Sequence, residues 1–173
     1  SQEKLESCIN SDLANNYGNL CQRVISFNEK NFKLEIPENY KFEKEDKFML
    51  NNFTEKFNIL INSVDNQDIN FYINFIIDQL FSANKYFNDQ EPWNKKSDKK
   101  RLNTIIYVSL ELIRKISIML YPIIPESSLK VLNVFNISEN QVNINSIVDH
   151  EYLKPKSKIK KINILFKKIE KDD

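Results

Sequence analysis

Apolar residues recur along most of the chain at intervals of three and four positions, with polar residues between them. This spacing is typical of amphipathic α-helices that bury one face in a shared core. It predicts four long helices, over residues 3–29, 44–64, 69–87 and 98–120. The fourth is apolar nearly all round, so we expect it to be the central, buried helix. Charged residues interrupt its apolar run and argue against a membrane span.

The apolar stripes of the first three helices define the expected core. The stripe of the first helix comprises Leu5, Ile9, Leu13, Leu20, Val24 and Phe27. The stripe of the second comprises Phe48, Met49, Phe53, Phe57, Leu60, Ile61 and Val64. The stripe of the third comprises Ile69, Tyr72, Ile73, Ile76, Ile77, Leu80 and Phe81.

Turn-forming residues separate the predicted helices. Asp65-Asn66-Gln67-Asp68 ends the second helix, and Asp68 is placed to cap the third. A polar break centred on Pro92 follows the third helix. Pro125 lies beyond the end of the fourth helix and can start a short fifth one, to about residue 135.

The helical pattern weakens after residue 136. We expect irregular structure with one short helix over residues 137–153, and a lysine-rich stretch, 154–170, that can close with a helix. The fold class is therefore all-α, an antiparallel helical bundle. We expect one domain in two parts: a bundle of residues 1–136, and a C-terminal segment, 137–173, that returns to pack on it.

Composition supports this fold and removes several kinds of site. The chain has 173 residues, 41% of them apolar, which suits one domain with a real core. Its single glycine excludes glycine-rich phosphate loops and disfavours β-rich folds. One histidine and two cysteines leave no set for a structural zinc, so we expect no metal site. His150 has acidic neighbours but no nucleophile at useful spacing, and we expect no catalytic residue.

The two cysteines, Cys8 and Cys21, both fall on the first predicted helix. Thirteen residues of helix separate them by about 20 Å and set them on different faces. They cannot bridge each other there, and we expect two reduced thiols, as in a reducing cytoplasm. The chain opens Ser-Gln-Glu without an initiator Met or a signal peptide. We expect a fragment of a longer protein.

A polar pair lies beside the lone glycine, Gly18, on the first helix. Asn19 and Arg23 are four residues apart and share one helix face. Asparagine offers a donor and an acceptor, and arginine a planar fork of donors, so together they can bind the edge of a nucleobase. The alternative is a solvated polar face. Gly18 indicates either a tight helix crossing or room for a ligand.

Trp93, the single tryptophan, follows Pro92 in a polar break rather than in an apolar stripe. An indole on a proline-rigidified turn offers a stacking surface to an unpaired base. The alternative is a ring that folds back over the end of the bundle.

A basic cluster follows the tryptophan directly, consisting of Lys95, Lys96, Lys99, Lys100 and Arg101. Such a cluster beside an aromatic platform can contact phosphates. The net charge is only +1, and the chain is rich in Lys, Asn and Ile, so a plain solvated helix start is the alternative. Only the distribution of charge, not its sum, bears on an RNA partner.

Four segments, taken in order, carry a family resemblance. They are residues 10–23, which include Tyr17-Gly18-Asn19-Leu20 and Arg23; Ala83-Asn84-Lys85-Tyr86 with Glu91-Pro92-Trp93; Leu110-Glu111-Leu112-Ile113-Arg114 with Leu120-Tyr121-Pro122-Ile123-Ile124-Pro125-Glu126; and Asn163-Ile164-Leu165-Phe166. Together they resemble the C-terminal helical anticodon-binding domain of methionyl-tRNA synthetases. Singly, the motifs also occur in the synthetases for valine, leucine, isoleucine and cysteine. The Asn19/Arg23 pair with Pro92-Trp93 favours methionine.

The resemblance implies a role for each site residue. Asn19 and Arg23 would contact the anticodon, chiefly its first base, a cytosine. Trp93 would stack on that base, and Pro92 would set the indole. The family often ends its returning segment with Phe-Pro-Arg, whereas here Lys167-Lys168 follows Phe166.

The resemblance also implies a parent enzyme that joins methionine to its tRNA with ATP. The chain has neither a His-Ile-Gly-His nor a Lys-Met-Ser-Lys-Ser signature, so the adenylate chemistry lies elsewhere in the parent. We expect tRNA and the parent's catalytic domain as partners, no cofactor in this chain, no membrane contact, a cytoplasmic location and a monomer. The alternatives are the matching domain of another class I synthetase and a non-catalytic adaptor bundle.

Overall fold

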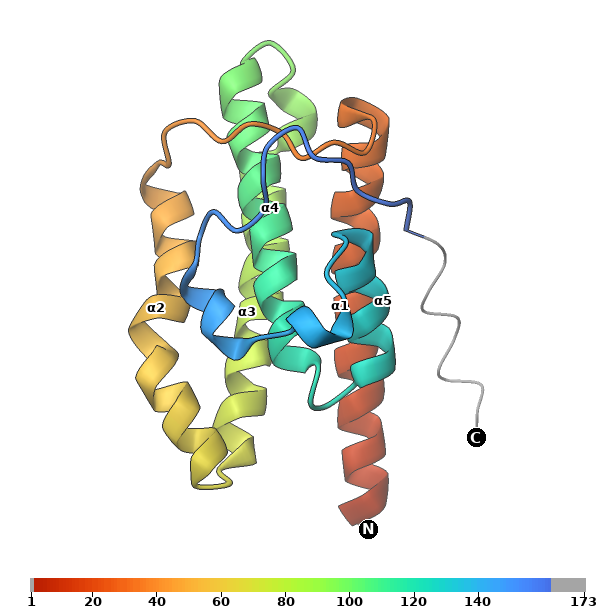
Figure 1. Ribbon diagram of the computed structural model, residues 1–173, viewed down its shortest axis with the longest axis vertical. Helices are drawn as coiled ribbons and strands as arrows, with labels where there is room; N and C mark the ends of the chain where they lie inside the picture. The colour runs from red at the N-terminus through yellow and green to blue at the C-terminus, as the bar shows by residue number, and fades with distance from the viewer. Residues whose placement is uncertain (1, 163–173) are drawn as a thin grey trace.

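Five α-helices form the framework of the protein (Figure 1). The computed structural model describes residues 2–162, with side chains from Ser11 onward. The helices are α1 (Gln2–Phe32), α2 (Lys44–Asp65), α3 (Ile69–Gln90), α4 (Lys99–Leu120) and α5 (Pro125–Val134). The described residues contain no strand, only one isolated bridge between Glu35 and Lys158. The predicted all-α bundle is confirmed, and the helices predicted between residues 3 and 135 are present with ends shifted by a few residues.

Side chains cap the helices where the sequence predicts it. The Asp68 carboxylate accepts a hydrogen bond from the backbone N–H of Phe71 and starts α3. Asp98 does the same for α4 through the N–H of Arg101, at 3.2 Å. Each carboxylate satisfies one of the backbone N–H groups that a helix start leaves without a partner.

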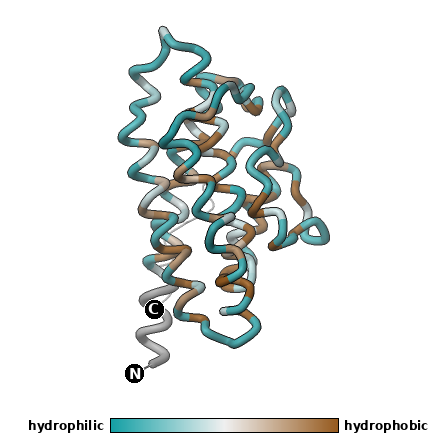
Figure 2. The backbone as a smooth tube through the Cα atoms, turned by 90° about the vertical axis from the view of Figure 1, so that its left-hand side faces the viewer, coloured by the Kyte–Doolittle hydropathy of each residue, from teal (hydrophilic) through white to brown (hydrophobic). Residues whose placement is uncertain are grey.

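Helix α4 is the centre of the core, as predicted. All of its residues from 104 to 120 are buried. Helices α1, α2, α3 and α5 and the short 3₁₀ helix η3 (Ile144–Val148) pack around it. Figure 2 shows the matching pattern, with hydrophobic segments along the helices and hydrophilic connections at both ends of the bundle.

Part of the expected core faces solvent instead. The exposed members of the predicted stripes are Phe48, Val64, Ile69, Ile77 and Phe81. Successive residues on a helix are about 100° apart, so on a helix with one solvent-facing side some residues of a broad apolar stripe must point away from the core. Met49, Ile76 and Leu80 take the inner positions, and their neighbours turn outward.

After α5 the chain returns across the bundle (Figure 1). Ile147, Leu153 and Ile159 are buried in the same core as the helices. Backbone hydrogen bonds join residues 156–159 to the α1–α2 connection, for example from Ile36 N–H to the Ser157 carbonyl at 2.9 Å. Residues 154–162, the first part of the lysine-rich stretch that was expected to close with a helix, are not helical. The rest of it lies outside the described residues.

A buried ionic cluster fixes this returning segment to α4. The Glu111 carboxylate pairs with Arg114 at 2.9 Å and accepts the backbone N–H of Leu153 at 2.8 Å. Arg114 also donates to the carbonyls of Ser146, at 3.1 Å, and Asp149, at 2.7 Å. Side chains of α4 thus give hydrogen-bond partners to an irregular stretch of chain whose backbone groups have none from regular secondary structure.

Lys115 completes the cluster. Its ammonium donates to the carbonyls of Ile147 and Asp149, both at 2.7 Å, and to Nδ1 of His150 at 2.9 Å. These three acceptors match the three N–H groups of a lysine. Burial lowers the pKa of Lys115 to about 7, and burial together with the charge of Lys115 lowers the pKa of His150 to about 4. The other ring nitrogen of His150 bonds to the Thr54 hydroxyl of α2, so the histidine is a structural bridge.

Candidate nucleic-acid interface

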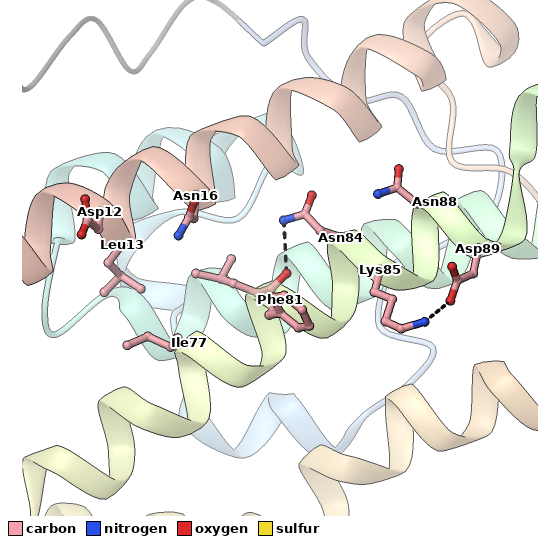
Figure 3. Close-up of a pocket in the computed structure, with 10 residues that line it drawn as sticks. Asp12, Leu13, Asn16, Ile77, Phe81, Asn84, Lys85, Asn88 and Asp89 are labelled. Carbon is pink, nitrogen blue, oxygen red and sulfur yellow. Dashed lines mark hydrogen bonds and ion pairs between the residues drawn. The ribbon is translucent and has the colours of Figure 1, made fainter.

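The middle of α1 lies against the last turns of α3, and Arg23 makes the connection. One terminal nitrogen of Arg23, Nη1, donates to Oδ1 of Asn84 at 3.2 Å. The other, Nη2, donates to Oδ1 of Asn88 at 2.5 Å. Asn84 and Asn88 are four residues apart on α3 and therefore share one helix face. Figure 3 shows both side chains pointing from α3 toward α1.

Trp93 is held by a sharp turn at the end of α3. Glu91 adopts a left-handed conformation, with φ 46° and ψ 61°, which breaks the helix. Pro92–Asn94 then form one 3₁₀ turn, η1, closed by a hydrogen bond from the Lys95 N–H to the Pro92 carbonyl at 3.1 Å. A left-handed residue other than glycine carries a conformational cost of about 1–2 kcal/mol. Such a conformation persists only where the surrounding structure holds it, and here it turns the chain into the 3₁₀ turn that carries Trp93.

Phe87 links the turn to Arg23. The rings of Phe87 and Trp93 have centroids 6.0 Å apart and are tilted by 60°. The guanidinium carbon of Arg23 lies 5.1 Å from the Phe87 centroid. Pro92 and Phe87 are buried, whereas the indole remains 44% exposed. The ring of Trp93 therefore rests on the bundle end but leaves surface free for a further contact.

Asn19 completes the set predicted from sequence. It is exposed and lies one helical turn before Arg23 on the same face of α1. Gly18 beside it is buried, which favours a tight helix crossing over space for a ligand. The structure thus brings both Arg23 and Trp93 against the ring of Phe87, with Asn19 one turn away along α1.

The basic cluster separates into different roles. Arg101 was expected to contact phosphate, but in this structure two carboxylates of the protein already engage its guanidinium. It bonds to Asp46 at 2.7 Å and Glu43 at 3.0 Å, and its side chain is only 10% exposed. The Asp46 carboxylate is buried and also accepts the Tyr86 hydroxyl. Burial alone would raise the pKa of Asp46, but the hydrogen bonds from Arg101 and Tyr86 hold it below its ordinary value.

The four lysines of the cluster differ in freedom. Lys95 donates to the Gln90 carbonyl at 2.9 Å and so helps to close the turn. The ammonium of Lys100 lies 5.5 Å from the centroid of the Tyr40 ring. Lys96 and Lys99 are exposed and, among the described residues, form no ion pair. These two are the best placed of the cluster to meet a phosphate.

A groove continues from this site along α1 and α3. It has a volume of about 720 Å³, and the Arg23 partners Asn84 and Asn88 form part of its lining (Figure 3). Asp12 and Asn16 of α1 and the 72% exposed ring of Phe81 contribute to its walls. Sequence analysis missed Asn84, Asn88 and Phe87 as site residues, although the polar pair at a four-residue spacing on α3 mirrors the pair on α1.

The described side chains include one cysteine, no metal-binding cluster and no membrane-spanning helix. Cys21 is a free thiol, as predicted, and burial raises its pKa. The side chain of Cys8 lies outside the described residues. No three or more His, Cys, Asp or Glu side chains among the described residues are arranged to hold a metal ion. Nor is any described helix long and apolar enough to cross a membrane.

Comparison with known sequences identifies close relatives. Residues 36–173 match the profile of a family described as the anticodon binding domain of methionyl tRNA ligase. The methionine–tRNA ligase of Thermotoga maritima is 32% identical over 175 residues, which cover 100% of this chain and 28% of the relative. That of Brucella suis is 34% identical over 138 residues, or 79% of this chain and 27% of the relative.

Solved structures agree. The Mycobacterium tuberculosis methionyl-tRNA synthetase in complex with methionyl-adenylate superposes with a TM-score of 0.84 at 30% identity, covering 96% of this chain and 33% of that one. The chain therefore spans about a quarter to a third of the length of these relatives. The matches favour methionine over the other synthetases and over an adaptor bundle. By its profile, its relatives and its fold, this chain belongs to the family of anticodon-binding domains of methionyl-tRNA ligases.

Proposed function

We propose that this domain binds the anticodon of methionine tRNA through Asn19, Arg23, Pro92 and Trp93. The observation that carries the proposal is the convergence of Arg23 and Trp93 on the Phe87 ring. Anticodon bases are single-stranded, and proteins recognise such bases by stacking them on aromatic rings and bonding to their edges. A half-exposed indole next to a fixed guanidinium offers both contacts.

The roles of the residues follow from their chemistry. Trp93 supplies a stacking face, which accepts any base. Arg23 supplies N–H donors that suit the O2 and N3 acceptors of cytosine, and the Asn19 amide can accept from the cytosine amino group and donate to another edge. Pro92 fixes the backbone before the indole, because its ring locks φ. Edge contacts, rather than the stack, select the first anticodon base.

The domain serves a larger enzyme in this proposal. That enzyme joins methionine to its tRNA and uses ATP in a separate catalytic domain, so the present chain contributes tRNA selection and no catalytic group. The relatives bear the name methionine–tRNA ligase and are about three to four times as long as this chain. We place the enzyme in the cytoplasm and propose that this domain is monomeric.

Binding of RNA stem-loops to the chain tests the proposal. The loop with the methionine anticodon is expected to bind more tightly than loops in which its first base is changed from cytosine to uracil, adenine or guanine. Equal affinity for all four loops would contradict anticodon recognition and would favour an adaptor bundle. Tighter binding of a valine or isoleucine anticodon would assign the domain to another tRNA.

A further inference from the structure

We propose that Asn84 and Asn88 are positioning residues that hold the Arg23 guanidinium in the orientation needed to bind a base edge. The inference rests on the proposed function and adds α3 to the site. The two asparagines are one helical turn apart and each accepts from a different terminal nitrogen of Arg23. A planar fork bound at both tips has its plane and its direction set.

The arrangement leaves donors for RNA. A guanidinium has five N–H groups, and the two bonds to the asparagines use one on each terminal nitrogen. The second N–H on each terminal nitrogen and the N–H on Nε are left over from these two bonds. Asparagine oxygens are uncharged, so they orient the arginine without cancelling the positive charge that a phosphate-rich ligand attracts.

Asn84 is itself held in place. Its amide nitrogen donates to the Leu80 carbonyl of the preceding turn at 3.2 Å, and its oxygen accepts from Arg23. Phe87 lies between the two asparagines in sequence, and its ring packs against the guanidinium of Arg23. Three residues within little more than one turn of α3 thus contact the head of one arginine, which is half-buried.

A pre-set arginine binds better than a mobile one. A free arginine side chain samples many rotamers, and ordering such a side chain on binding weakens affinity by about 3- to 10-fold. The asparagines remove that penalty before RNA arrives. The same bonds also join α1 to α3, so a purely structural role must be separated from a positioning role.

A double-mutant cycle makes this separation. Asn88→Ala is the main variant because Asn88 is exposed and its loss leaves no buried group without a partner. It is combined with Arg23→Ala, and affinity for the methionine stem-loop is measured for the wild type, both single variants and the double variant. Thermal unfolding of each variant reports on stability, and Asn74→Ala, an exposed asparagine on the same helix, is the matched control.

Positioning predicts coupling between the two residues. Asn88→Ala is expected to weaken binding about 3- to 10-fold when Arg23 is present and less than about 2-fold when it is absent. Asn84→Ala is expected to behave alike, and Asn74→Ala to change nothing. Equal losses in both backgrounds, or no loss in either, would overturn the inference while leaving the proposed function intact. If Arg23→Ala itself leaves binding unchanged, the proposed site is wrong, and so is the positioning role of Asn84 and Asn88.

Discussion

Trp93 and Arg23 share a neighbour but offer a base different kinds of contact. The indole presents a flat, partly exposed face, and in the proposed site this face would stack on a base whatever its identity. The guanidinium presents directional donors, which depend on what the base edge accepts. Substitutions at the two positions should therefore fail in different ways.

Removing the indole should weaken binding of every anticodon loop. Trp93→Ala is expected to weaken the binding free energy by about 1–3 kcal/mol for cognate and non-cognate loops alike, since stacking tolerates all bases. Titrating the variant with four stem-loops that differ only in the first anticodon base measures this loss of affinity. Trp93→Phe keeps a stacking ring and should recover most of the affinity. A loss confined to the loop with cytosine would show that the indole reads sequence.

Removing the asparagine of α1 should erode selectivity. Asn19→Ala is expected to narrow the affinity ratio between loops with cytosine and uracil in the first position, because an edge contact carries the sequence information. Asn19 is exposed, so folding should be unaffected. The ratio of the two dissociation constants is the measurement. A uniform loss over all loops, with the ratio unchanged, would place Asn19 outside the edge contact.

The contacts of Asn84 and Asn88 with Arg23 were not predictable from sequence, for a physical reason. The spacing of Asn84 and Asn88 shows that they share a helix face, but which face meets Arg23 depends on how α1 and α3 are rotated and shifted against each other. That register is set by packing between residues more than sixty positions apart. Trp93 was easier to identify, because a tryptophan after a proline in a polar turn stands out locally.

At the scale of helices, the local sequence pattern predicted well where helices occur. It predicted less well which side of each helix faces the core. Apolar spacing places the four long helices, Asp68 marks the start of α3, and Pro125 marks the start of α5. Where two apolar residues are adjacent, as at Phe48 and Met49, the pattern cannot say which one turns inward, and burial decides between them. The basic run after Trp93 does not reveal the ion pairs of Arg101, because its two acidic partners, Glu43 and Asp46, lie at the start of α2, far away in sequence.

Arg101 should matter for stability rather than for RNA. It joins the first turn of α2 to α4 through the fully buried Asp46. Arg101→Ala would leave that carboxylate buried without its cation and is expected to destabilise the fold by about 3 kcal/mol. Urea unfolding measures this, with Lys99→Ala as the control from the same turn of α4. A variant that keeps its stability but loses RNA affinity would restore Arg101 as a phosphate contact.

The attachment of the returning segment to α4 should depend on pH. The pKa of His150 is about 4 in the fold, below its ordinary value of 6.5, so the fold favours the neutral ring. Between pH 6.5 and 4 the unfolded chain binds more protons, and stability falls as the pH falls through this window. Lys115, with a pKa of about 7 instead of 10.5, makes stability rise with pH from 7 to 10.5.

His150→Gln isolates the first of these effects. Glutamine keeps hydrogen-bonding groups but does not titrate, so the fall in unfolding free energy between pH 6.5 and 4 should be shallower than in the wild type. Urea unfolding across that range gives both slopes. Below about pH 4 both proteins should lose stability together, because protonation of Asp46 breaks its pair with Arg101. Parallel slopes above pH 4 would mean that His150 is not the titrating group.

For the whole molecule, the charge distribution decides how much binding is sequence-independent. The net charge of +1 gives little general attraction to RNA, so phosphate contacts must come from local lysines. Lys96 and Lys99 are exposed just beyond the Trp93 turn, whereas Arg101 and Lys95 are engaged within the fold. The bundle therefore presents a small basic edge beside one stacking face.

Neutralising that edge should weaken all stem-loops alike. The double variant Lys96→Gln with Lys99→Gln is expected to flatten the slope of log affinity against log salt by about 1 to 1.5 units. The reason is that RNA binding with fewer phosphate contacts releases fewer counterions. The matched control is Lys47→Gln with Lys130→Gln, two exposed lysines on α2 and α5. Selectivity for the first base should survive, because it depends on Asn19 and Arg23. If instead the lysine changes abolish binding while Trp93→Ala and Asn19→Ala bind as the wild type does, recognition is electrostatic and the base pocket is wrong.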